Sequence, residues 1–105
     1  NNFINIPELQ EKAFLMNVMR NKWILRREIE RFSGKKINSI LITESGIIAA
    51  AHLSGPGNVK KFLRNNCSYN LDFKDINGTK ISDYIKIFRN YDISKILAIR
   101  KPYIN

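Results

Sequence analysis

The chain has 105 residues, which favours one small domain over residues 1–105 because chains of this length rarely divide. Hydrophobic residues make up 44% of the sequence, so the chain can bury a core and extended disorder is not expected. Eighteen Lys and Arg against nine Asp and Glu leave a formal charge of +9, which favours anionic partners such as nucleic acid, an acidic membrane surface or bacterial wall polymers. One cysteine and one histidine exclude a disulfide framework and a cysteine-rich or multi-histidine metal site. No apolar run approaches the length of a membrane span, and no secretory signal precedes the domain, so we expect a mature product or an excised piece.

The first expected helix begins near Pro7, a residue suited to a first helical turn. Glu8 and Glu11 would lie near the positive end of its dipole. Apolar residues at helical spacing then continue to Ser33-Gly34, where the glycine indicates a helix end. The pattern allows a break near Asn21, so this region is one long helix or two joined ones. The apolar stripe consists of Phe14, Val18, Leu25, Ile29 and Phe32.

A small, apolar helix is expected in the middle of the chain. Residues 35–42 form a connector whose isoleucines suit a short extended piece. Thr43 is the expected N-cap of a helix over residues 44–53, because its hydroxyl can accept from a backbone N–H one turn on. This helix is apolar on nearly every side, which is typical of a helix at the centre of a domain. Gly55-Pro56-Gly57 ends it and starts the next helix.

The C-terminal part reads as loop, turn, helix and a short final element. Residues 65–74 have a loop-like composition, and Asn77-Gly78 is a turn signal. Thr79 or Ser82 is expected to cap the next helix. Residues 91–105 contain enough apolar side chains to pack down as a last short element. The sequence therefore predicts a mainly α-helical domain of four or five helices.

Residues 49–63, AAAHLSGPGNVKKFL, are the most informative stretch. They resemble the substrate-cleft motif of lytic transglycosylases and related lysozyme-like enzymes, which typically reads AAYNAGPG followed by a valine and a basic helix. Together with NGTKISDYIKIF (residues 77–88), the chain is similar to the C-terminal half of lysozyme-like domains in bacterial and phage cell-wall hydrolases. Gln10-Glu11 matches a Gln-Glu pair of that family, and the resemblance spans roughly residues 7–92.

The resemblance implies a small lysozyme-like helical domain, or the C-terminal half of one, that acts on the glycan strands of peptidoglycan. It implies substrate-binding roles for His52, Ser54, Gly55 and Asn58. His52 stands where the family often has tyrosine, and Leu53 stands where many members have an asparagine that contacts sugar. A packed, hydrogen-bonded histidine is the alternative for His52, and a plain helix-ending turn explains Ser54 and Gly55 equally well.

A catalytic acid is the missing part of the resemblance. Glycan cleavage in the family uses a protonated glutamate that closes an early helix and precedes a stretch similar to GKYQFG. This sequence contains no such stretch. Glu11 is the remaining candidate, but the first turn of a helix favours the ionised carboxylate, and capping is the usual role there. Glu44, which follows Thr43, meets the same objection. The chain therefore resembles a fold portion without its acid, either a fragment or a catalytically silent relative.

Other chemistries have weaker support, and no cofactor or metal is expected. Cys67 has no catalytic histidine close in sequence, which favours a loop thiol without a role. Gly55-Pro56-Gly57 before Lys60-Lys61 could hold an anion but lacks the GxxxxGK[ST] pattern of a phosphate loop. Residues 20–36 carry seven basic and two acidic residues, yet they show no motif that reads bases.

Three functional hypotheses follow. The first is a module that binds or cleaves peptidoglycan, or another anionic wall polymer, with an upstream segment or larger assembly supplying the acid. The second is a silent structural component of a phage tail or secretion apparatus, and the third is a basic nucleic-acid-binding domain. The first two place the protein in the cell envelope or periplasm, or in a phage or secretion particle.

Overall fold

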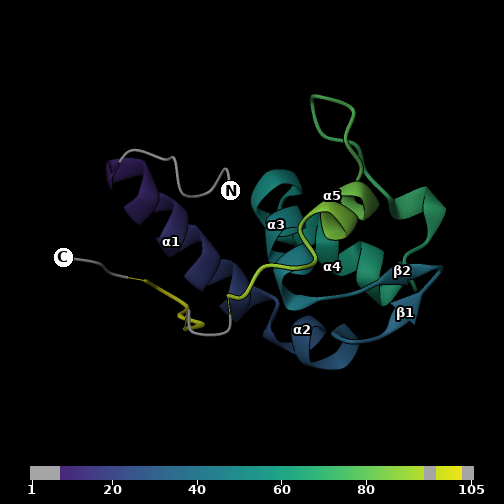
Figure 1. Ribbon diagram of the computed structural model, residues 1–105, viewed down its shortest axis with the longest axis horizontal. Helices are drawn as coiled ribbons and strands as arrows, with labels where there is room; N and C mark the ends of the chain where they lie inside the picture. The colour runs from purple at the N-terminus through teal and green to yellow at the C-terminus, as the bar shows by residue number, and fades with distance from the viewer. Residues whose placement is uncertain (1–7, 94–96, 103–105) are drawn as a thin grey trace.

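The computed structural model describes residues 8–93 and 97–102, with side chains from Leu15 onward. Over these residues the chain forms five α-helices, a two-stranded hairpin and one 3-10 helix, so the mainly α-helical class is confirmed (Figure 1). The expected helix start at Pro7 and the side chain of Phe14 lie outside the described residues. The elements are α1 (Glu8–Ile24), α2 (Arg26–Phe32), β1 (Lys36–Ile37), β2 (Ile40–Leu41), α3 (Glu44–Ser54), α4 (Pro56–Arg64), η2 (Tyr69–Leu71) and α5 (Ile81–Ile87).

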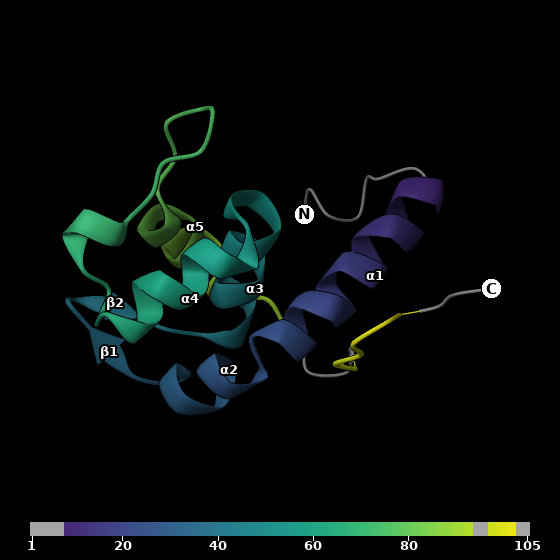
Figure 2. The ribbon, with the colours of Figure 1, turned by 180° about the vertical axis from the view of Figure 1, so that it is seen from behind.

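The first helical region is two joined helices. The joint lies at Leu25, close to the expected break near Asn21, and α1 extends away from the body formed by the other helices (Figures 1 and 2). The predicted stripe faces the core on both sides of this joint, because Val18, Leu25 and Phe32 are all buried. Between α2 and α3 the connector folds into an antiparallel hairpin that pairs Ile37 with Ile40.

Helix α3 lies at the centre of the domain, as its apolar sequence predicts. Thr43 caps it, since its Oγ1 accepts from the Gly46 N–H at 3.1 Å. A Cβ at Gly46 would lie 2.8 Å from the carbonyl oxygen of Ile85, so α3 and α5 approach as closely as glycine allows. The alanines of α3 are buried beside large apolar side chains from α1, α4 and α5.

One expectation for the C-terminal part is wrong, and another is tested only in part. Lys80, not Thr79 or Ser82, is the N-cap of α5, and the Asp83 carboxylate accepts from its N–H at 3.1 Å. Ser82 lies inside the helix and bonds elsewhere. Of the last element expected over residues 91–105, residues 91–93 and 97–102 form no helix or strand, and the other residues lie outside the described part. The described residues do pack down: Ile93 packs against the core, and the Ile99 N–H donates to the Met19 carbonyl of α1 at 3.0 Å. Throughout the part of the chain that can be described, no helix is both long and apolar enough for a membrane span.

Candidate functional site

The corner between α3 and α4 turns at a single glycine. Gly55 has a φ of +89°, a conformation that favours glycine because a Cβ would strain it. Its N–H donates to Ala51 at 2.9 Å. Asn58 Nδ2 donates to the Ser54 carbonyl at 2.9 Å, which ties the first turn of α4 to the end of α3. The corner is held by these bonds and stays partly open to solvent, with Gly57 exposed.

A pocket of about 460 Å³ lies beside this corner. Ser54 and Asn58 line one side, while residues 73–77 and Tyr84 of α5 line the other. Apolar surface comes from Phe73 and from two exposed side chains, Leu53 at 41% and Ile76 at 99% exposure. Apolar surface next to hydrogen-bonding groups suits a polar ligand with apolar faces.

Asp75 is the polar centre of the far wall. Its Oδ1 accepts from the N–H groups of Asn77 and Thr79, both at 2.9 Å, and its Oδ2 accepts from the Tyr84 hydroxyl. These donors, first Tyr84 and then Thr79, hold the pKa of Asp75 below its ordinary value. The same contact raises the pKa of Tyr84. At neutral pH, Asp75 is therefore an ionised acceptor and not a proton donor.

Ser54 brings an unsatisfied hydroxyl to the pocket region. Its Oγ is buried and has no hydrogen-bond partner within the part of the chain that the structure describes. Leaving a buried polar group unpaired costs free energy, but this oxygen has almost no exposed surface, so a ligand in the pocket reaches it only if the Ser54 side chain rotates. Of the residues singled out from the sequence, Ser54 and Asn58 are brought together here, while Gly55 shapes the corner without joining the lining.

His52 lies on a different side of α3. Two residues apart on a helix means a rotation of about 200°, so His52 and Ser54 point in nearly opposite directions. His52 Nδ1 is 2.7 Å from Asn17 Oδ1 of α1, and the same oxygen accepts from Asn21 Nδ2 at 2.8 Å. A carbonyl oxygen only accepts, so His52 Nδ1 carries the proton. Burial lowers the pKa of His52, and the ring is neutral near pH 7.

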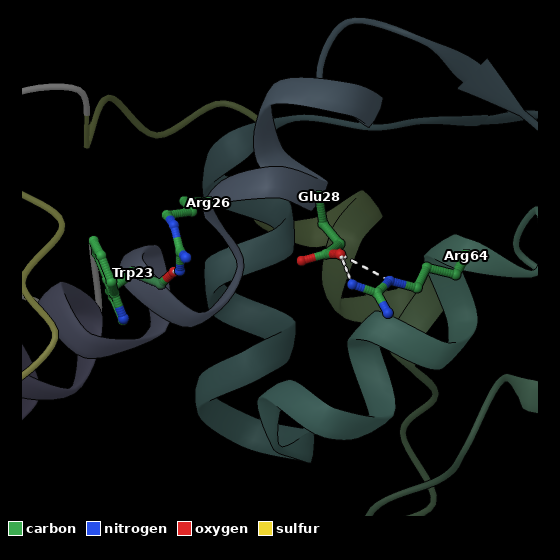
Figure 3. Close-up of polar contacts among 4 residues, drawn as sticks. All are labelled: Trp23, Arg26, Glu28 and Arg64. Carbon is green, nitrogen blue, oxygen red and sulfur yellow. Dashed lines mark hydrogen bonds and ion pairs between the residues drawn. The ribbon is translucent and has the colours of Figure 1, made fainter.

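None of the glutamate side chains that can be placed reaches the pocket. Glu11 lies on α1, but its side chain is outside the described residues. Glu28 is 3% exposed, and its Oε2 is 2.9 Å from Nε and 2.8 Å from Nη2 of Arg64 (Figure 3). Glu44 forms an ion pair with Lys22 at 3.4 Å. Glu28 and Glu44 therefore form ion pairs between helices and do not face the pocket.

The basic segment over residues 20–36 turns part of its charge inward. The Arg26 guanidinium lies 3.8 Å from the ring centre of Trp23 (Figure 3). Lys22 is only 6% exposed, and its Nζ donates to the Ile93 carbonyl at 2.7 Å. The segment therefore offers a nucleic-acid backbone fewer free cations, and one aromatic face less, than its composition indicates.

Cys67 and the acidic residues offer no further reactive centre. Cys67 is 1% exposed, and burial together with the Asp72 carboxylate raises the pKa of its thiol to about 11. The thiol is protonated at neutral pH and a poor nucleophile. Over residues 8–93 and 97–102, no three His, Cys, Asp or Glu side chains gather as a metal site would require.

No protein-family model, curated protein or solved structure matches the chain. The resemblance to lysozyme-like domains therefore stays a prediction from the residues of the motif.

Proposed function

We propose that this chain is a peptidoglycan-associated, lysozyme-like module whose pocket beside Gly55 binds the glycan strand. The support is the meeting of the two motif segments, which residues 64–76 separate in the sequence. Ser54 and Asn58 belong to the first segment and its corner, Asn77 and Tyr84 belong to the second, and all four line one pocket. The pocket therefore brings both motif segments to one surface, although many of their other residues pack in the core.

The chemistry of the pocket suits a sugar polymer. Ile76 and Phe73 offer apolar surface for a sugar ring, while the Asn77 amide offers hydrogen-bonding groups for its hydroxyls and acetamides. Asp75 is held ionised and binds as an acceptor. Glycan cleavage needs a protonated acid beside the bond, so cleavage by this module requires a carboxylic acid from another segment or chain.

Binding to purified peptidoglycan in a sedimentation assay tests the proposal. Ile76→Ser removes a side chain that is 99% exposed, so the fold does not depend on it. We expect binding to weaken about fivefold, since burying part of an isoleucine under a sugar contributes about 1 kcal/mol.

Ile87→Ser is the matched control, because Ile87 is 63% exposed and lies outside the pocket lining. Equal loss of binding in Ile76→Ser and Ile87→Ser would contradict the proposal, as would failure of the unaltered chain to sediment with peptidoglycan. A zymogram with the same proteins separates binding from cleavage.

A silent assembly component is the second candidate. The observation that favours it is the absence of any glutamate among the described residues lining the pocket. Such a component would bind peptidoglycan as above and would copurify with a larger particle. Wall cleavage by the isolated, monomeric chain would exclude it.

A further inference from the structure

A second pocket, of about 440 Å³, lies between α1 and the C-terminal segment. Three cationic side chains face it, and within the described part of the chain no acidic residue contributes to its walls. It shares no described lining residue with the pocket beside Gly55. The described lining consists of Met16, Asn17, Arg20, Arg100, Lys101 and Pro102.

The path of the C-terminal segment brings these cations together. The Ile99 N–H bonds to the Met19 carbonyl, and the next residue on each side of that bond is an arginine, Arg100 and Arg20. Figures 1 and 2 show the segment passing alongside α1. Both arginines are exposed, and neither forms an ion pair with a described carboxylate. Like charges repel, so this arrangement is weakened by its own cations unless an anion lies between them.

We propose that this pocket binds a phosphate group carrying two negative charges, either free or as a monoester. Two guanidinium groups can each present paired N–H donors to such a group, and Lys101 adds a third charge. A dianion balances three cations better than a single carboxylate does. Asn17 Oδ1 already accepts from two groups, which leaves its Nδ2 to donate toward the ligand.

The ligand is a phosphate-bearing small molecule and not a nucleic-acid strand. No aromatic residue is found among the described lining residues, so nothing there is placed to stack a base. The volume of the pocket exceeds that of a phosphate group and leaves room for the group that the phosphate esterifies. This site is independent of the proposed peptidoglycan function.

Titration of the 105-residue chain with inorganic phosphate, at constant ionic strength maintained with chloride, tests the site. The side-chain amide signal of Asn17 in a ¹⁵N NMR spectrum reports binding, and thermal unfolding reports the accompanying stabilisation. The double variant Arg20→Gln/Arg100→Gln alters two exposed side chains and should bind phosphate at least about tenfold more weakly, because each lost charge-assisted contact contributes strongly. Lys61→Gln is the control, because it removes one exposed charge from α4, next to the Gly55-Pro56-Gly57 turn and outside the proposed pocket. It should change the affinity less than about twofold.

Glycerol 3-phosphate and dimethyl phosphate identify the form of the ligand. Binding of glycerol 3-phosphate as tight as that of inorganic phosphate, or tighter, supports a monoester ligand, and weaker binding supports free phosphate. Dimethyl phosphate carries one charge, so equal binding of this diester would overturn the assignment of a dianion. The site itself is overturned if phosphate acts no differently from chloride, or if Lys61→Gln loses as much affinity as the double variant.

Discussion

Removing Arg64 from its ion pair with Glu28 should destabilise the fold more than removing the charge of Glu28. Glu28 is 3% exposed, whereas the Arg64 side chain is 52% exposed (Figure 3). Arg64→Ala leaves a buried carboxylate without its cation, a change that costs about 3–5 kcal/mol when a pair is fully buried. Because solvent already screens half of the arginine, we expect the lower end, about 3 kcal/mol. Glu28→Gln leaves a cation that water can solvate, and should cost about 1 kcal/mol.

Urea unfolding of the two single variants and the double variant measures this difference. A loss of about 3 kcal/mol corresponds to a fall in melting temperature of about 12–24 °C for a domain of this size. Glu28→Gln/Arg64→Ala should be about 2 kcal/mol more stable than Arg64→Ala alone, since it contains no unpaired buried charge. Equal losses in the two single variants, or no recovery in the double variant, would refute the reasoning that the buried carboxylate dominates.

Four further outcomes follow from the described geometry. Gly55→Ala has open space for its Cβ but a φ of +89°, so it should lower the free energy of unfolding by about 1–2 kcal/mol through the backbone alone, as chemical denaturation will show. His52 should titrate with a midpoint below 6.5 in ¹H NMR, and a midpoint above 6.5 would contradict the partial desolvation of its ring. Cys67 should resist a thiol reagent in the native protein and react on unfolding, and fast native labelling would argue against the buried position. The pKa of Asp75 is lowered in the folded state, so its stabilisation is complete above about pH 4 and lost as pH falls through the lower folded pKa; Asp75→Asn should remove this dependence from acid unfolding curves.

The helices could be predicted because local rules set their positions. Thr43 at an N-cap, glycine at a helix end and apolar residues at helical spacing each act within one or two turns. The same rules failed for α5, where Thr79 and Ser82 compete as caps. Ser82 instead lies inside the helix, where the Asp72 carboxylate accepts from its N–H at 2.9 Å and from its hydroxyl. That partner lies ten residues away, and no local rule weighs it.

The burial of a charged residue in the core could not be predicted from the sequence either. Glu28 lies three residues after Leu25 and four before Phe32, at the edge of the predicted stripe, where its charge gives no signal of burial, yet it is as buried as Phe32. Its partner is 36 residues away on α4. Pairing across helices decides which charged residues can enter a core, and a pattern read along a single helix does not contain that information.

The candidate site shows where sequence reasoning reaches its limit. A helix repeats every 3.6 residues, so the separation of His52 from Ser54 follows from their spacing alone. The opposite wall could not be deduced in this way, because it depends on how residues 73–77 return to the end of α3 across a loop. The cationic pocket depends in the same way on the register between Ile99 and Met19, which one backbone hydrogen bond records. In both pockets a regular helix, whose position local sequence sets, supplies one wall, and a segment without regular structure supplies the other. Variants in the irregular walls, such as Ile76→Ser, should therefore alter the proposed binding with little effect on the helices, and they are the changes that test function separately from stability.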